Sequence, residues 1–325
     1  MNRQSPKGIS YCDWSWSPIR GCQRVSPGCE HCYAERIAAR FSGTGTVTWS
    51  KTEPFSGIAE MTPSGPRWTG EVRLIESKLD EPLRARRSAE KFRREHGRKP
   101  IVFVMDMGDL FYEKVPDEWV YRVYESMFVA CWFDFLVLTK RAGRMATLFA
   151  PERPWDHIWL GVSAEDQARF DERAPPLLKL AAAGWKTWVS FEPLLEPISA
   201  RWAKWDSGKD QNGSRRPVVN EHDGLRMLNL GGIAIGGESG PGARPCAVEW
   251  IEALVNQARA AGVACHVKQL GANAQDADGS MHGQYTAGGV KHGFPKLRDS
   301  HGGDPSEWPE ALRVREWPEP LRGAR

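Results

Sequence analysis

Six short apolar runs recur along the chain, and each of them ends in polar or charged residues. The runs are Ile101–Met105, Phe135–Leu138, Ile158–Val162, Thr187–Phe191, Ile233–Ile235 and Ala264–Val267. They are rich in β-branched and aromatic residues, as strands buried on both faces are. This recurrence constrains the fold more than any other feature of the sequence, because buried strands need a layer of helices to cover them.

Helical patterns lie between several of these runs. We expect helices over Tyr33–Phe41, Glu76–His96, Pro116–Trp132, Glu165–Leu180 and Ala247–Ala261, the fourth capped by Ser163 and the last ended by Gly262. Strands that alternate with helices predict a parallel sheet with right-handed crossovers. Weaker strand candidates near Ile9–Trp16 and Glu71–Ile75 bring the number to about eight, which favours a full or partial TIM-like (β/α) barrel. A doubly wound open sheet is the alternative.

The sequence also predicts how the chain is divided. Residues 1–271 carry the strand–helix pattern and are expected to form the barrel, with a polar, glycine-rich surface insertion at about residues 202–224. Residues 272–325 are rich in Gly, His and Asp and lack periodicity. We expect them to form an irregular tail that packs on the barrel.

Composition narrows the class of protein. Hydrophobic residues make up 41% of the 325, enough for a sizeable core, and the formal net charge is only +3. No stretch approaches the roughly 18 apolar residues of a membrane span, and residues 1–10 lack the apolar centre of a secretory signal. We therefore expect a cytoplasmic protein with no membrane partner. Seven cysteines in such a chain favour thiols or metal ligands over disulfides.

Three of the cysteines lie close together in a C-x6-C-x2-C pattern, Cys22, Cys29 and Cys32. Pro27 and Gly28 predict a turn that brings the first cysteine back toward the other two. The predicted helix Tyr33–Phe41 follows at once, and a helix N-terminus favours negative charge. Three thiolates on one loop suit three irons of a [4Fe-4S] cluster and leave the fourth iron open to a small molecule.

Two other interpretations of this loop stay open. A zinc ion needs four ligands, and Cys12 or His31 would be the fourth. The third interpretation is that the three cysteines bind no metal. Of the other cysteines, Cys131 and Cys265 are expected in the core, and Cys246 is assigned no role.

Polar residues follow the predicted strands, and in a β/α barrel the carboxyl ends of the strands form the active face. The candidates for binding substrate or phosphate are Asp106, Asp109, Lys140, Arg141, Ser163, Glu165, Lys268 and Gln269. Glu192, also at a strand end, is a candidate for contact with a cofactor or substrate. Salt bridges among these residues are the structural alternative. The carboxylates would alternatively hold Mg²⁺ in a phosphoryl-transfer enzyme.

The cysteine loop resembles that of the radical S-adenosylmethionine (SAM) superfamily, whose usual spacing is C-x3-C-x2-C. The first gap is longer here, and His31 fills the position before the third cysteine that is aromatic in that superfamily. Gly236, Gly237, Glu238 and Ser239 resemble the Gly-Gly-Glu segment that binds the methionyl amino group of SAM, although they follow a late strand. A tight turn with a solvated Glu238 is the alternative. The resemblance implies a [4Fe-4S] cluster, SAM, an electron donor and 5′-deoxyadenosyl radical chemistry.

The whole chain resembles an uncharacterised, phage- and actinobacteria-associated three-Cys-motif family that is described as radical-SAM-like. The matching segments are Gly21–Glu35, Met105–Phe111, Leu138–Arg144, Leu160–Phe170, Val189–Pro197, Ala234–Pro245, Val267–Gly271 and Gly302–Pro318. This resemblance implies a radical-SAM-type barrel and an iron–sulfur enzyme, but no particular substrate or oligomeric state.

Basic residues gather in Arg84–Lys99, which carries eight Lys or Arg against Glu90 and Glu95. Together with the phage association, this segment favours a nucleic-acid partner and a damaged or modified DNA base as substrate. A solvated outer helix is the plainer interpretation. A nucleic-acid-binding protein stabilised by zinc or a cluster, without turnover, is the alternative function.

Overall fold

The computed structural model describes residues 1–4, 8–43, 53–200, 230–276, 284–287, 290–293 and 297–318. The chain divides into two compact units, and each is described by itself. The first comprises residues 1–145 and 153–159, and the second comprises residues 146–152 and 160–319. The predicted insertion at about 202–224 lies outside the described residues.

Four strands, three of them mutually parallel, form the centre of the first unit. In spatial order they are β1 (Asn2–Arg3), β2 (Trp14–Trp16), β7 (Ile101–Val104) and β8 (Asp134–Thr139). The pairs β2–β7 and β7–β8 are parallel, while β1 runs antiparallel along the edge of β2. The strand β9 (Ile158–Ser163) begins in this unit, where the Phe135 amide donates to the carbonyl of His157 (2.7 Å). All four residues of β7 are buried, as the apolar run predicts.

Helices of the first unit are α1 (Tyr33–Phe41), α2 (Glu76–Leu79), α3 (Glu81–Arg84), α4 (Arg86–His96), α5 (Asp117–Val129) and α6 (Ala142–Phe149), whose last turn enters the second unit. The single helix expected over residues 76–96 is therefore wrong. Asp80 and Ala85 leave the helical conformation, with ψ of 6° and 9°. Pro82 explains the break at Asp80, because proline is accepted in the first turn of a short helix and disrupts the middle of a long one.

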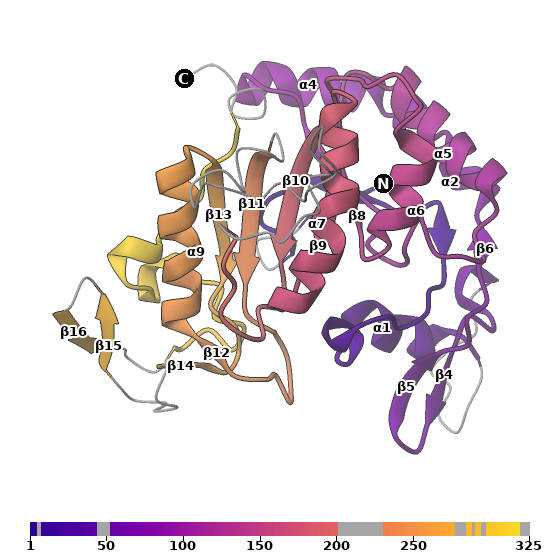
Figure 1. The fold of residues 1–325 in the computed structure, drawn as a ribbon. Helices are drawn as coiled ribbons and strands as arrows, with labels where there is room; N and C mark the ends of the chain where they lie inside the picture. Colours follow the sequence, from indigo (N-terminus) through magenta and orange to yellow (C-terminus); the bar gives the residue numbers. More distant parts are fainter. Residues whose placement is uncertain are drawn as a thin grey trace, which may run out of the picture. The chain divides into compact units, whose positions relative to one another are not determined.

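A β-hairpin between α1 and α2 has no counterpart in the sequence-based prediction. Its strands are β4 (Ala59–Thr62) and β5 (Gly65–Trp68), and it lies against α1 (Figure 1). A separate antiparallel pair joins β3 (Ile19–Arg20) to β6 (Arg73–Leu74). The strand expected near Glu71–Ile75 thus exists, but it is not part of the main sheet.

The second unit repeats the strand–helix alternation. Its strands follow the order β9, β10 (Lys186–Phe191), β11 (Leu230–Gly236) and β13 (Ala264–Gln269), and β10–β11 and β11–β13 are parallel. The helices are α7 (Gln167–Ala182) and α9 (Val248–Ala261), and α9 ends at the left-handed Gly262 as predicted. Asp166, not Ser163, caps α7, because its side chain accepts a hydrogen bond from the Arg169 amide (2.6 Å).

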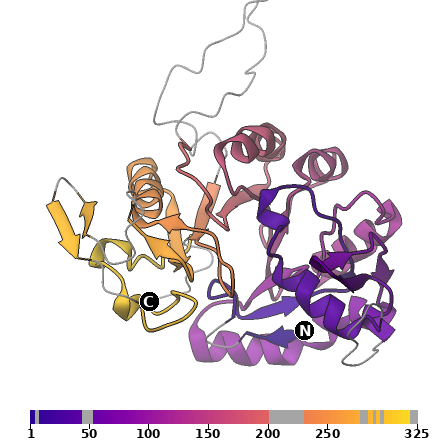
Figure 2. The ribbon, with the colours of Figure 1, turned by 90° about the horizontal axis from the view of Figure 1, so that it is seen from below.

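The residues after β13 remain on the second unit. Strand β12 (Cys246–Ala247) pairs with β14 (Ala274–Gln275), β15 (Gln284–Ala287) pairs with β16 (Val290–Gly293), and two short 3₁₀ helices follow, η3 (Pro305–Glu307) and η4 (Glu310–Leu312). The Val267 amide donates to Val314 and the Glu316 amide to Cys265, both at 2.8 Å, so this terminal segment lies along β13 (Figure 2). It protects an edge of β13 that would otherwise be unpaired.

The described residues therefore form a mixed α/β fold with mainly parallel strands, as the alternating pattern predicts. Closure into a TIM-like barrel remains a prediction. Among the described residues, no helix combines the length and the apolar character that crossing a bilayer requires.

The close packing of β9 on β10 provides a test of this core. A Cβ atom added to Gly161 would lie 2.2 Å from Nε1 of the buried Trp188. We expect Gly161→Ala to lower the free energy of unfolding by about 1–3 kcal/mol, as overpacked cores do, in urea denaturation. Gly143→Ala is the matched control, because Gly143 lies in α6 and, apart from the backbone of its own helix, no other group lies within 4 Å of the added Cβ. It should leave stability unchanged or raise it by up to about 1 kcal/mol. Equal effects of the two substitutions would contradict this account.

Candidate functional site

Two glycines fix the start of the cysteine loop. Gly21 has a φ of +102°, and a Cβ there would lie 2.0 Å from the carbonyl oxygen of Glu71. Gly21 also forms a parallel bridge with Gly108, where a Cβ would approach the Gly21 oxygen to 2.8 Å. Since Gly108 follows β7, this bridge places Cys22 at the carboxyl end of β7. Only glycine fits both positions.

An ion pair attaches the long segment between Cys22 and Cys29 to α1. Arg24, inside the gap, donates through Nε to both carboxylate oxygens of Glu35 on α1 (3.1 and 3.0 Å). The buried Glu35 also accepts from the Trp68 amide of β5 (2.8 Å). The predicted turn is present as the short 3₁₀ helix η1 (Pro27–Cys29). The loop is therefore anchored to both α1 and the hairpin, and its extra residues are held in place.

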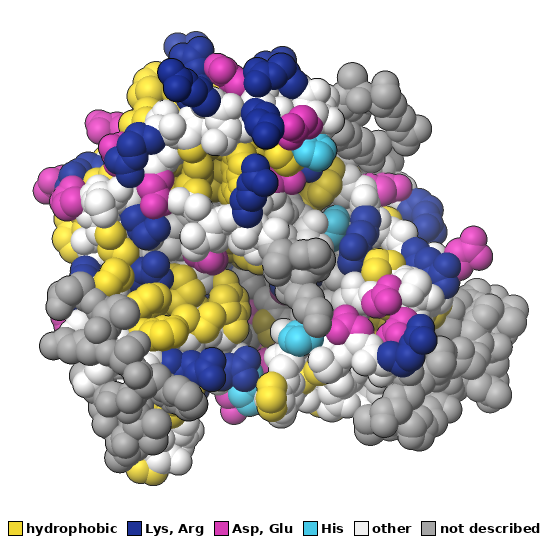
Figure 3. Space-filling model, turned by 180° about the vertical axis from the view of Figure 1, so that it is seen from behind, with side chains coloured by type: hydrophobic (Ala, Val, Ile, Leu, Met, Phe, Trp, Pro, Cys, Tyr) yellow, Lys and Arg dark blue, Asp and Glu magenta, His cyan; other side chains and the backbone are white. Residues whose placement is uncertain are grey.

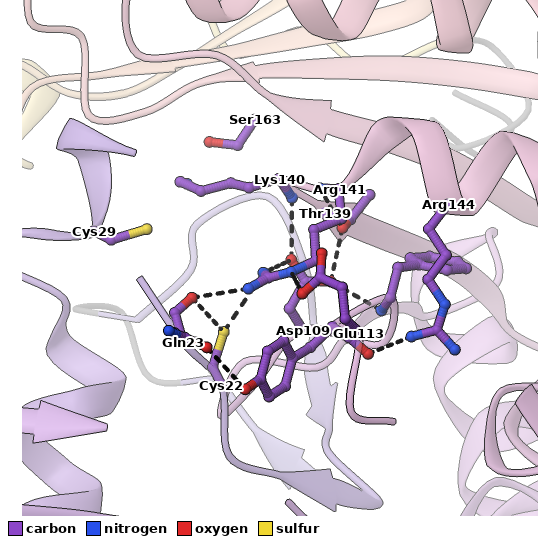
Figure 4. Close-up of polar contacts among 12 residues, drawn as sticks. Cys22, Gln23, Cys29, Asp109, Glu113, Thr139, Lys140, Arg141, Arg144 and Ser163 are labelled. Carbon is purple, nitrogen blue, oxygen red and sulfur yellow. Dashed lines mark hydrogen bonds and ion pairs between the residues drawn. The ribbon is translucent and has the colours of Figure 1, made fainter. Parts of the chain in front are cut away.

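Arg141 joins the cysteine loop to the ends of β7 and β8. Its guanidinium donates to Glu113 (2.9 Å), to Asp109 (3.1 Å) and to the Gln23 carbonyl (2.9 Å). It also lies 3.8 Å from the Cys22 sulfur and 4.8 Å from the centre of the Tyr112 ring. Figure 4 shows the guanidinium among these partners. Arg141 is only 8% exposed, so its charge depends on them.

Asp109 is the buried counter-charge of this arrangement. Besides Arg141, it accepts from the Thr139 hydroxyl (2.7 Å) and from the amides of Phe111 (2.9 Å) and Lys140 (3.1 Å). Burial alone would lower the pKa of Arg141, but Asp109 and its other neighbours raise that pKa above its usual range. The guanidinium of Arg141 is therefore charged throughout the physiological pH range.

Asp106, the other predicted carboxylate at the end of this strand, has different hydrogen-bond partners. It accepts hydrogen bonds from the hydroxyls of Ser15 (2.8 Å) and Ser17, and its carbonyl accepts from the Tyr33 hydroxyl (2.8 Å). Asp106 and Asp109 thus both face protein donors rather than each other. They form no preassembled pair for a divalent cation.

The environment of the cysteines keeps two of the thiols protonated. Burial raises the pKa of Cys22, and Asp109 adds to this effect while Arg141 opposes it. Burial also raises the pKa of Cys32, although the amides of Glu35 and Ala34 at the start of α1 hydrogen-bond to its sulfur and oppose the rise. Cys29 lies away from the Arg141 group (Figure 4), with its sulfur 3.9 Å from the Ser26 hydroxyl. Metal binding would therefore release protons from this loop.

A single-ion site is not preformed. Among the described residues there is no group of three His, Cys, Asp or Glu side chains placed to hold one metal ion. Thiolates that share one zinc lie within about 4.6 Å of each other, because each Zn–S bond is about 2.3 Å long. A [4Fe-4S] cluster allows larger distances between the sulfurs, since each thiolate binds its own iron. The three thiols on one anchored loop fit that donor set.

The other cysteines lie outside this loop. Cys12, considered as a zinc ligand, precedes β2 and directs its sulfur to the Ile9 carbonyl (3.5 Å). Burial raises the pKa values of Cys246 and Cys265 to about 12. Cys131 is exposed, contrary to the core position expected, because it follows the end of α5 instead of lying within it.

The hairpin also covers part of the loop, which the sequence did not indicate. Cys32 packs against a small apolar cluster whose buried members are Ala34, Ala38, Ala39, Ile58, Ala59 and Met107, with Met61 and Trp68 of the hairpin beside it. Small residues on α1 permit this close approach. His31, also a predicted contact, is partly buried on the same loop.

The predicted residues of the second unit form a separate polar group. Glu192 pairs with Lys268 (3.1 Å) and accepts from the Ser190 hydroxyl (3.0 Å). The Ser163 hydroxyl donates to the Glu192 carbonyl (3.0 Å), and the Gln269 amide group donates to the Gly237 carbonyl (2.7 Å). The ends of β9, β10, β11 and β13 thus meet through these side chains, and the salt-bridge alternative holds for Lys268. Glu165 is instead fully buried against Arg173 (2.9 Å).

The Gly-Gly-Glu segment is packed by the protein itself. A Cβ on Gly236 would lie 2.9 Å from the Glu192 carboxylate, and one on Gly237 would lie 2.2 Å from the Leu270 carbonyl oxygen. Glu238 is only 7% exposed and pairs with Arg244 (2.7 Å), so the solvated glutamate considered above is wrong. Ser239 follows and is partly exposed. Internal packing alone accounts for both glycines.

Removing Arg141 should be costly because Asp109 would remain buried without a counter-charge. We expect Arg141→Met to lower the free energy of unfolding by about 3–5 kcal/mol in urea denaturation. Adding Asp109→Asn should recover part of that loss, which a double-mutant cycle would measure. The control is Arg122→Met, which removes an exposed ion pair with Glu76 and should change stability little. If Arg141→Met is as mild as this control, Arg141 does not hold the site together.

Comparison with known proteins gives three findings. No curated protein matches the chain. A solved structure of a spore photoproduct lyase mutant matches with 13% sequence identity and a TM-score of 0.35, covering 72% of this chain. The chain spans 59% of the length of that structure.

A family described as "Protein of unknown function (DUF5131)" matches residues 6–299. That description does not mention the phage- and actinobacteria-associated family, so this resemblance stays an expectation. Since the match covers most of the sequence, the chain belongs to the DUF5131 family.

Proposed function

We propose that this protein is an iron–sulfur enzyme of radical-SAM type, with a barrel of that type as its complete fold. Cys22, Cys29 and Cys32 would hold a [4Fe-4S] cluster. The observation that carries the proposal is the cysteine loop itself, which is anchored at the carboxyl end of β7 by the Gly21–Gly108 bridge and by Arg141. The carboxyl ends of parallel strands are where β/α proteins place their chemistry.

The residues around the loop suit a cluster of this kind. When bound, such a cluster supplies one electron for the reductive cleavage of SAM. The amides of Glu35 and Ala34 donate to the Cys32 sulfur, and Arg141 lies beside the Cys22 sulfur. Hydrogen bonds and positive charge near thiolate sulfurs stabilise the negative charge that reduction adds. The hairpin and α1 keep water from one side of Cys32.

Glu192 and Lys268 are the contacts we propose for the polar groups of SAM or substrate. Their mutual ion pair can be exchanged for a ligand's ammonium and carboxylate groups, one partner for each. Glu238 is a weaker candidate than the Gly-Gly-Glu resemblance implies, because its carboxylate already pairs with Arg244.

The two alternative functions have no such support. For phosphoryl transfer, the carboxylates of Asp106 and Asp109 would have to leave their serine, threonine and arginine donors to bind Mg²⁺. For a nucleic-acid-binding protein without turnover that is stabilised by zinc, the thiols and a fourth ligand would first have to be brought together. The form stabilised by a cluster differs from our proposal only in the absence of SAM cleavage, which the second test below measures. We therefore do not propose either function.

The substrate expected from the sequence was a nucleic-acid base, because Arg84–Lys99 is basic. That segment lies at the opposite ends of the strands from the cysteine loop. Arg98 pairs with Asp13, just before β2, and Lys99 lies 3.9 Å from Asp134, at the start of β8. The segment therefore lies away from the cysteine loop, and we propose the reaction type without a substrate class.

Anaerobic reconstitution tests the cluster. The wild-type protein should bind about four irons and four sulfides and show the broad visible absorption of a cluster, because three thiolates and an exchangeable ligand suit that type. Cys22→Ala, Cys29→Ala and Cys32→Ala should each abolish it. Cys131→Ala is the matched control, since Cys131 is an exposed thiol outside the loop, and it should bind iron normally. Stoichiometric zinc without iron would overturn the proposal.

The catalytic half of the proposal has its own test. After reduction by dithionite in the presence of SAM, the reconstituted protein should release 5′-deoxyadenosine, which chromatography detects. Glu192→Gln and Lys268→Met should weaken SAM binding without loss of iron. A cluster that forms and never cleaves SAM would leave an iron–sulfur binding protein in place of an enzyme.

A further inference from the structure

We infer that the outer face of α4 is a docking surface for the phosphate backbone of DNA, separate from the cysteine loop and independent of its proposed function. The surface consists of Arg87, Lys91 and Arg94, which we call the α4 stripe. These residues are spaced i, i+4 and i+7, so they share one face of the helix.

The opposite face of α4 attaches the helix to the first unit. Ala89 is buried, the ring of Phe92 stacks on His96 (4.1 Å between centroids), and Phe92 also contacts Trp14 of β2 (5.8 Å). This contact fixes the helix on the start of β2. The α4 stripe therefore points away from the core, and all three of its residues are exposed.

Several charges on α4 are not neutralised by the protein. Arg86 pairs with Glu90 (2.8 Å), and Lys91 is 3.8 Å from Glu95. Within the part of the chain that the structure describes, Arg87 and Arg94 have no ion-pair partner. Figure 3 shows Lys and Arg side chains gathered along the upper edge of the molecule, where α4 runs.

The charge of α4 is out of proportion to the rest of the chain. Five basic and two acidic residues give the helix a net charge of +3, which equals the formal net charge of the whole chain. Arg87 also occupies the first turn, which has no acidic residue, although positive charge is unfavourable at a helix N-terminus. A residue that lowers the stability of its helix and makes no compensating contact within the protein is expected at a functional surface.

The chemistry of the α4 stripe favours nucleic acid over a membrane. Helices that lie on membranes insert large apolar side chains beside their basic ones. The exposed large apolar residues among the described ones are Val25, Tyr33, Phe128 and Val129, and none of them is on α4. The stripe spans about 10 Å along the helix axis, which suits contact with successive phosphates of a duplex.

The test measures binding of the full-length protein to a short fluorescein-labelled DNA duplex at increasing salt. The triple variant Arg87→Gln, Lys91→Gln and Arg94→Gln removes the stripe with a residue that favours helix. It should reduce the slope of log affinity against log salt by about 2.7, since each phosphate contact contributes about 0.9. Between about 50 and 200 mM salt, the wild type should lose roughly 40-fold more affinity than the variant.

The matched control removes three exposed basic residues elsewhere, Lys179→Gln, Arg259→Gln and Arg298→Gln, and should keep the wild-type slope. Cys22→Ala should bind DNA as the wild type does, so the two proposals can fail separately. No binding of the wild type to duplex DNA at low salt, or an equal change of slope in both triple variants, would overturn the inference. Wild-type binding to phosphatidylserine vesicles instead of DNA would overturn it too.

Discussion

The buried ion pair between Arg141 and Asp109 is the interaction on which the candidate site depends. Taking two charges out of water is costly, and the cost is offset only when every donor and acceptor finds a partner. Here Asp109 accepts from a hydroxyl, two amides and a guanidinium. The remaining donors of Arg141 reach Glu113 and the Gln23 carbonyl. The ends of two strands and the cysteine loop are thus fixed by one guanidinium.

This arrangement explains how a long cysteine loop can be held in place. The six residues between Cys22 and Cys29 make a longer gap than the C-x3-C spacing of the radical-SAM loop that this loop resembles. A longer flexible loop costs more conformational entropy to order. Three anchors remove most of that freedom: the Gly21–Gly108 bridge, the Arg141 contact with Gln23, and the Arg24–Glu35 pair. Burial raises the pKa values of Cys22 and Cys32 in this setting, so a metal that binds these two thiols must displace their protons.

In the first unit, the cysteine loop and the basic helix α4 lie at opposite ends of the parallel strands. The cysteine loop lies where β7 ends, and α4 contacts the start of β2. Since β2, β7 and β8 are parallel, these are opposite ends of the sheet. Any partner of α4 would therefore bind away from the cysteine loop.

The sequence by itself determined the parallel strands, the turn and helix that carry the three cysteines, and the polar residues at the strand ends. These depend on local periodicity, on proline and glycine, and on short spacings, which a sequence displays directly. Only the tertiary structure decided which of those polar residues meet. Arg141 reaches Gln23 and Cys22 across more than one hundred residues, and Glu238 is taken by Arg244. The β4–β5 hairpin and the division of residues 76–96 into three helices also escaped sequence reasoning. Long-range pairing and close packing depend on which residues lie close together in three dimensions. A local pattern of residues does not show this, because the residues concerned are far apart in the sequence.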